Sequence, residues 1–184
     1  MKILAISGSL RAASTNTALL RATAELAPAN VEIQLYDGLD TLPYFSPERD
    51  TEPAPEPIHV LRTQLREADA VIVCTPEYIH GMPGILKNML DWLASSGEFV
   101  YKPVSVISAS PSDMGGSLAH ASLFHTLEVL TAYLPPDASL IIPFIRTKMD
   151  RNGNVIDSVL TQQLSDVVAA LVKAVQTNPA TVQN

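Results

Sequence analysis

The residues best suited to chemistry are the polar side chains of one short loop, residues 7–16, between a predicted strand and a predicted helix. The loop carries three serines, one threonine, one asparagine and one arginine. Main-chain N–H groups at a helix start have no partner within the helix, and the helix dipole favours an anion there. The hydroxyl groups of the loop and Arg11 could complete a phosphate cradle. The alternative is a polar loop in which Ser14 only caps the helix.

Several familiar site patterns are absent from the sequence. The loop lacks the Gly-Lys-Ser/Thr ending of a Walker motif, and Gly8 has no glycine partners at the spacing of the Rossmann fingerprint. No nucleophile elbow is present, so hydrolase chemistry has no support. His120 and His125 lie on a predicted helix without ligand-like partners, so we predict no metal site. These absences argue against an NTPase, a classical dehydrogenase and a hydrolase.

Two further loops could form the rest of a ligand site. In residues 75–84, Pro76 ends a strand, and Tyr78 could lie against a flat aromatic ligand; the alternative is a stiff structural turn. In residues 108–116, the glycines permit a close approach of the main chain, and Ser110 and Gly115 are expected to face the same crevice.

The elements that must position these loops alternate along the chain. Short apolar runs predict strands at residues 3–6, 31–36, 70–74, 104–109 and 138–142. Helical periodicity predicts helices at residues 15–26, 58–68, 84–94, 116–134 and 155–175. Such alternation indicates a parallel sheet with helices on both faces, and ligands of these folds bind beyond the carboxyl ends of the strands. Residues 43–57 hold five prolines without periodicity and predict either a surface loop or a flap beside the site.

Composition limits the possible partners. The 184 residues are 47% hydrophobic with a net charge of −7, which fits a globular domain and argues against general nucleic-acid binding. The single cysteine, Cys74, excludes an internal disulfide. We find neither a signal peptide nor an apolar run long enough to cross a membrane, and therefore predict a cytoplasmic protein. We expect a single domain over residues 1–177 and a frayed tail at 178–184.

Taken together, the three loops resemble the NADPH-dependent FMN reductase family, which includes chromate, quinone and azo-dye reductases. The resemblance spans roughly residues 3–170. The matching residues are Gly8-Ser9-Leu10-Arg11 with Ser14 and Asn16, Thr75-Pro76-Glu77-Tyr78, Pro83-Gly84, Leu86-Lys87-Asn88, Asp91-Trp92, and Ser110 with Gly115-Gly116.

The resemblance implies a flavodoxin-like α/β sandwich with a five-stranded parallel sheet of order 2-1-3-4-5. It implies bound FMN, with the phosphate held by Ser9, Arg11, Ser14 and Asn16. The ring would be lined by Pro76, Glu77, Tyr78 and Ile79, with Ser110 and Gly115 at its other edge. The family usually has Asn where this chain has Ile79, and often Ser where it has Gly81.

The implied activity is hydride transfer from NADPH or NADH to FMN, followed by reduction of a quinone, flavin, azo or metal-oxyanion acceptor. No catalytic side chain is expected, because the flavin carries the chemistry. The family's members are usually dimers or tetramers, so the helical face of Lys87, Asn88 and Asp91 is either a subunit interface or a solvated surface. Two alternatives remain: a flavodoxin-type electron carrier and a non-enzymatic flavin-binding regulatory protein.

Overall fold

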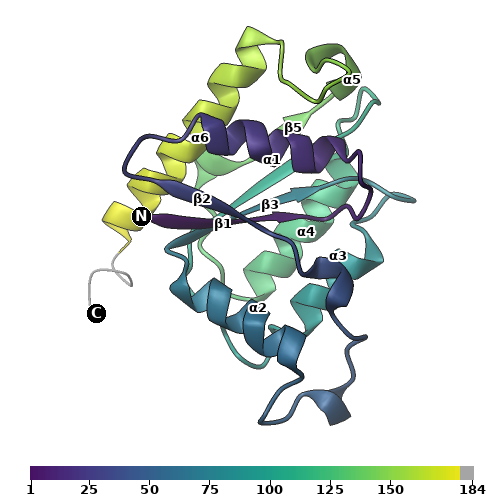
Figure 1. Cartoon of the computed structure of the whole chain (residues 1–184), viewed down its shortest axis with the longest axis vertical. Helices are drawn as coiled ribbons and strands as arrows, with labels where there is room; N and C mark the ends of the chain where they lie inside the picture. The colour runs from purple at the N-terminus through teal and green to yellow at the C-terminus, as the bar shows by residue number, and fades with distance from the viewer. Residues whose placement is uncertain (179–184) are drawn as a thin grey trace.

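Five parallel strands form the centre of the computed structural model, which describes residues 1–178 (Figure 1). Their order is β2-β1-β3-β4-β5, as predicted. The strands are β1 (Lys2–Ser7), β2 (Glu32–Tyr36), β3 (Ala70–Thr75), β4 (Val104–Ala109) and β5 (Leu140–Ile142). β3 and β4 are buried along their whole length, as expected for strands covered on both faces. The predicted fold class is therefore confirmed.

Helices cover both faces of this sheet (Figure 1). One apolar cluster joins one face of the sheet to α1 and α6, and a second joins the other face to α2, α3 and α4. Alternate residues of a strand enter different clusters, as with Ile3 and Leu4 in β1, because successive side chains point to opposite faces. The helices are α1 (Thr15–Glu25), α2 (Glu56–Glu67), α3 (Gly84–Asp91), α4 (Ser117–Val129), α5 (Ile145–Lys148) and α6 (Ser158–Thr177).

The helix predicted for residues 116–134 is too long. α4 ends at Val129, and Thr131 takes a left-handed conformation with φ of 60°. The chain then runs extended, and Tyr133 forms a parallel bridge with Pro103, next to β4. The short helix α5 and three short 3-10 helices were not predicted; they are Leu39–Thr41, Pro47–Arg49 and Pro136–Ala138.

The proline-rich segment is held against α3, on the side of the sheet that carries α2. The carbonyl oxygen of Pro43 accepts hydrogen bonds from Trp92 Nε1 at 2.8 Å and from Asn88 Nδ2 at 3.0 Å. Trp92 is fully buried and lies edge-on to Phe45, so it belongs to the core of this chain. Arg62, also buried, binds Asp50 at 2.8 Å and closes the segment against α2.

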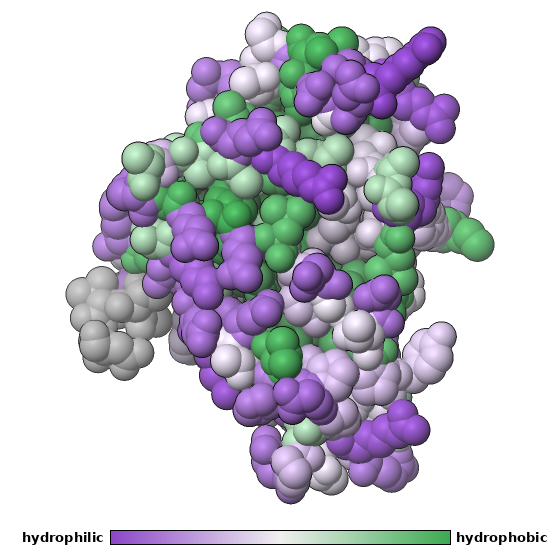
Figure 2. All heavy atoms as spheres, in the orientation of Figure 1, coloured by the Kyte–Doolittle hydropathy of each residue, from purple (hydrophilic) through white to green (hydrophobic). Residues whose placement is uncertain are grey.

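Two surface features complete the description. Figure 2 shows hydrophobic side chains among hydrophilic ones near the middle of the face that carries the edge strand β2. Within residues 1–178, no helix is both long and apolar enough to cross a membrane. Of the tail expected at 178–184, Asn178 is buried and donates a hydrogen bond to the carbonyl oxygen of Tyr101 at 2.7 Å. Residues 179–184 lie outside the described residues.

Candidate functional site

The three predicted loops meet at the carboxyl edge of the sheet. The main-chain N–H of Gly8 donates to the carbonyl oxygen of Cys74 at 2.8 Å, which joins the loop after β1 to the end of β3. A Cβ atom at Gly8 would lie 3.3 Å from the Pro76 ring, so the two loops are in close contact there. Eight of the ten predicted cofactor residues line one hollow of about 180 Å³: Ser9, Arg11, Ser14, Asn16, Pro76, Glu77, Tyr78 and Ser110.

The N-terminus of α1 presents hydrogen-bond donors to this hollow. Ser14 is the N-cap, and its Oγ accepts from the main-chain N–H of Thr17 at 3.2 Å. Within the described part of the chain, the main-chain N–H groups of Thr15 and Asn16 have no acceptor. The Oγ of Ser9 accepts one main-chain N–H, from Arg11, and its hydroxyl hydrogen remains able to donate. Because these main-chain N–H groups and the Ser9 hydroxyl can all donate hydrogen bonds, together they suit a phosphate.

The side chain of Asn16 is the most specific part of the donor set. It is 5% exposed, and its Oδ1 accepts from the thiol of Cys74 at 3.1 Å. Burial raises the pKa of the Cys74 thiol, so the sulfur keeps its hydrogen and remains a donor. This contact directs the amide nitrogen of Asn16 away from the core. In residues 1–178 that nitrogen has no acceptor and is open to solvent, so it can donate a hydrogen bond to an anion supplied from outside the chain.

The loop after β3 contains a tight two-residue turn. Tyr78 and Gly81 exchange main-chain hydrogen bonds of 3.0 and 3.2 Å, and the residues between them, Ile79 and His80, have positive φ of 50° and 59°. The turn directs the Ile79 side chain outward, where it is 98% exposed and outside the lining of the hollow. Tyr78, by contrast, is half exposed and lines the hollow.

Glu77 connects this loop to α4. Its Oε2 accepts hydrogen bonds from the main-chain N–H groups of Leu118 and Ala119, both at 3.0 Å. Gly116, the N-cap of α4, offers no side chain, and the carboxylate of Glu77 takes that role from a distant loop. Glu77 therefore lines the hollow while its charge stabilises the start of a helix.

The loop after β4 contributes Ser110 to the hollow but keeps Gly115 outside it. The Oγ of Ser110 accepts from the main-chain N–H of Ser112 at 3.2 Å. Gly115, with φ of 60°, is packed against the end of β5: a Cβ atom there would lie 2.7 Å from Ile141 and 2.9 Å from the nitrogen of Pro143. Gly115 thus sets the position of the loop that carries Ser110.

A second hollow, of about 420 Å³, adjoins the first at Arg11 and Tyr78. Its other walls are Gly8, Leu10, Pro83, Gly84 and Ile85. Arg11 is exposed and forms no ion pair within residues 1–178, so its guanidinium is available to a ligand in either hollow.

Sequence reasoning missed one side of the first hollow. Ile145 and Arg146, from α5, complete its lining together with Thr15, Ala109 and Pro111. The signal was available, because β5 is parallel to its neighbours and its carboxyl end must lie at the same edge of the sheet. Within the described residues, no group of three or more His, Cys, Asp or Glu side chains could hold a metal ion.

Comparison with known proteins identifies the family. The family model described as NADPH-dependent FMN reductase matches residues 1–147. The chain belongs to this family. A subunit of the NADH:(hydroxy)cinnamate reductase of Vibrio ruber is 34% identical over 170 residues, which cover 91% of this chain and 83% of that protein. A 2-hydroxy-1,4-benzoquinone reductase from Burkholderia is 33% identical, with 85% and 86% covered.

A solved structure agrees with this assignment. The flavoenzyme NAD(P)H:(acceptor) oxidoreductase FerB from Paracoccus denitrificans superposes with a TM-score of 0.86 at 28% identity, covering 96% of this chain and 98% of that one. The predicted resemblance is confirmed, and with it the reading of the chain as an FMN-dependent oxidoreductase that uses NAD(P)H.

Proposed function

We propose that the hollow lined by the three loops holds FMN, with its phosphate at the N-terminus of α1 and its ring beside Pro76 and Tyr78. The observation that carries this proposal is the side chain of Asn16 in the lining of the hollow, whose amide nitrogen has no acceptor within residues 1–178, beside two main-chain N–H groups in the same condition. Arg11 and the hydroxyls of Ser9 and Ser14 would complete the phosphate contacts. Bound FMN would supply the redox chemistry, because it can accept a hydride and then give up electrons.

The protein's own residues would bind and orient rather than react. Pro76 and the Tyr78–Gly81 turn fix the ring-side loop, and Glu77 ties that loop to α4. Ser110 lies at the opposite wall. These side chains need not act as an acid, a base or a nucleophile, since the hydride would pass directly from NAD(P)H to FMN.

A quinone-type compound is the acceptor that we propose. One named relative is a subunit of an NADH:(hydroxy)cinnamate reductase and another is a 2-hydroxy-1,4-benzoquinone reductase, and both of these substrates contain an unsaturated ring. The apolar walls of the second hollow, Leu10, Pro83 and Ile85, favour a flat ligand of that kind next to Tyr78.

We further propose that residues 1–177 form one FMN-binding domain that acts in the cytoplasm as a homodimer or homotetramer. Support for assembly comes from apolar side chains left exposed around the site, of which Ile79 is 98% and Leu10 is 56% exposed. Asn88, in contrast, is buried by the proline-rich segment, which leaves only Lys87 and Asp91 of the predicted interface face on the surface, paired with each other. Sedimentation at several concentrations tests the assembly.

The phosphate assignment is tested by Arg11→Ala, with Arg49→Ala as control. Arg49 is also exposed and lies in the proline-rich segment, outside the lining of the hollow. We expect Arg11→Ala to bind FMN about tenfold more weakly, the scale of one charge-assisted hydrogen bond, and Arg49→Ala to bind it normally. Equal affinities in a fluorescence titration of the two variants would refute the assignment.

The activity is tested by anaerobic reduction. The purified protein with FMN should show flavin bands near about 370 and 450 nm that bleach when NADPH or NADH is added. Bound flavin that neither donor reduces would favour a flavodoxin-type electron carrier. A protein that binds no flavin would favour a non-enzymatic role for this scaffold.

A further inference from the structure

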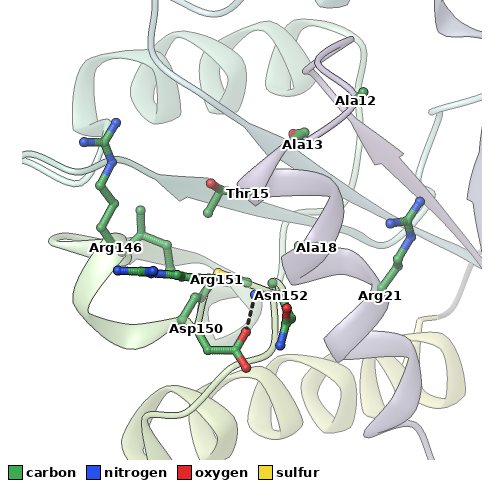
Figure 3. Close-up of a pocket in the computed structure, with 13 residues that line it drawn as sticks. Ala12, Ala13, Thr15, Ala18, Arg21, Arg146, Asp150, Arg151 and Asn152 are labelled. Atoms are coloured by element: carbon green, nitrogen blue, oxygen red, sulfur yellow. Dashed lines mark hydrogen bonds between the residues drawn. The ribbon is translucent and has the colours of Figure 1, made fainter.

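A hollow of about 350 Å³ lies beside the phosphate loop, between α1 and residues 145–153. Three arginines from two segments of the chain surround it: Arg21 from α1, and Arg146 and Arg151 from the segment across from it (Figure 3). We name it the arginine pocket. Arg21 and Arg146 stand at opposite ends of the view, with Arg151 and Asp150 between them (Figure 3).

These cationic groups are not neutralised by the protein. Within residues 1–178, no salt bridge involves Arg21, Arg146 or Arg151. The chain holds 19 acidic and 12 basic residues, so carboxylates are plentiful elsewhere. Three unpaired arginines around one hollow of an acidic protein indicate a place for an anion from outside.

The one carboxylate in the pocket is already engaged. Asp150 accepts hydrogen bonds from the main-chain N–H groups of Asn152 and Asn154, at 2.8 and 2.9 Å, and from Asn154 Nδ2 at 2.8 Å. These bonds, first that from the Asn154 side chain, hold the pKa of Asp150 below its usual range. The carboxylate thus shapes the loop that carries Arg151, and its charge is spread over three donors.

Small residues keep the pocket open. Its wall on the α1 side is formed by Ala12 and Ala13, from the loop before the helix, and by Ala18 of α1. Gly153 has φ of 87°, and a Cβ atom there would lie 3.2 Å from the Cβ of Ala18, so the loop approaches the helix closely. The loop is therefore held against α1 at one end, while the alanines leave room beside it.

The pocket continues into the proposed flavin site. Ser14, Thr15, Ile145 and Arg146 line both hollows. A ligand longer than one hollow can therefore extend past the start of α1 from one into the other. The volume of the pocket is at the lower end of the range for sites that bind small molecules.

We propose that the arginine pocket binds the phosphorylated adenosine half of NADPH, with its 2′-phosphate among the three arginines that line the pocket, while the nicotinamide half lies against the bound flavin. This rests on the proposed function and extends it to donor preference. NADH lacks the 2′-phosphate, so the pocket would favour NADPH. FAD offers similar chemistry, because its adenosine diphosphate half could extend from the phosphate loop in the same direction.

The first test is binding to the FMN-loaded protein, measured by calorimetry with 2′,5′-ADP and 5′-AMP as probes. We expect 2′,5′-ADP to bind at least about tenfold more tightly. The double variant Arg21→Gln/Arg151→Gln should remove that difference, whereas Arg49→Gln, an exposed arginine remote from the pocket, should retain it. Equal affinities in the unaltered protein, or a difference that survives the double variant, would overturn the proposal.

The second test is steady-state oxidation of both donors with a quinone acceptor. In the double variant, KM for NADPH should rise about tenfold or more while KM for NADH stays within about twofold. An equal change for both donors would overturn the 2′-phosphate assignment. FAD binding more tightly than FMN, with the preference lost in the double variant, would assign the pocket to FAD instead. Failure of the proposed function is distinguishable, since flavin would then not be reduced by either donor although 2′,5′-ADP binding could still be measured.

Discussion

The carboxylate of Glu77 offers the sharpest test of how this site is built. It binds two main-chain N–H groups of α4, those of Leu118 and Ala119, at 3.0 Å each, and its side chain is 16% exposed. Loss of a helix cap costs about 0.5–2 kcal/mol, and a charge at a helix N-terminus adds about 0.3–1 kcal/mol. We therefore expect Glu77→Ala to lower the free energy of unfolding by about 2 kcal/mol. Glu77→Gln keeps an acceptor oxygen and should lose about 1 kcal/mol or less.

The measurements are urea unfolding and thermal unfolding of the protein freed of flavin, each followed by circular dichroism. For a chain of this size, a loss of about 2 kcal/mol lowers Tm by about 4–8 °C. Glu128→Ala is the matched control, because Glu128 is exposed near the opposite end of the same helix, and the one ion pair of its side chain within residues 1–178 is with His125. Its effect should stay within about 0.5 kcal/mol.

The flavin-free protein separates two roles for Glu77. A cap acts whether or not flavin is bound, so its removal must destabilise the protein without flavin. If Glu77→Ala is as stable as Glu128→Ala but binds FMN less tightly, Glu77 is a direct contact of the cofactor, and the reasoning from its bonds to α4 is refuted.

Three further outcomes follow from the packing of single residues. Gly115→Ala should lose about 2 kcal/mol or more in the same urea assay, since its φ is positive and the added methyl would lie 2.7 Å from Ile141; an unchanged midpoint would contradict this. The Cys74 thiol is fully buried and its pKa is raised by burial, so a thiol reagent should modify it only after denaturation. Burial lowers the pKa of His120, which lies 3.3 Å from the Val106 carbonyl oxygen. The unfolded chain then binds the additional proton, and stability should fall as pH drops below about 6.5. A His120→Gln variant with the same pH dependence would refute the His120 assignment.

The fold could be predicted because its signals are local. Wholly apolar runs such as residues 70–74 mark central parallel strands, and the helices between them follow from periodicity. The overlong helix shows the limit of this reasoning. Leu130, Ala132 and Leu134 extend the apolar run beyond α4, but they are spaced two apart as in an extended segment, and Tyr133 pairs with Pro103, a residue thirty positions earlier. Local periodicity carries no information on such a pairing.

The candidate site could be predicted to the extent that loops at one edge of a parallel sheet converge. That rule alone brings Ser9 and Ser110 to the same hollow. It does not say which way a side chain points. Gly115 faces β5 because the turn requires a residue without a Cβ atom, and Arg146 enters the site from a helix that the sequence did not reveal.

Ile79 shows how the ring-side loop keeps its shape despite an unfavourable residue. A left-handed conformation costs an ordinary residue about 1–2 kcal/mol, and the Asn usual in the family tolerates it better than a β-branched side chain. Here the turn is closed by the paired main-chain bonds of Tyr78 and Gly81, and Glu77 fastens the loop to α4 just before it. These bonds lie at the ends of the turn and involve no atom of the Ile79 side chain. The path of the main chain in this loop is therefore fixed by bonds that the Ile79 side chain does not make, and that side chain is directed to the surface.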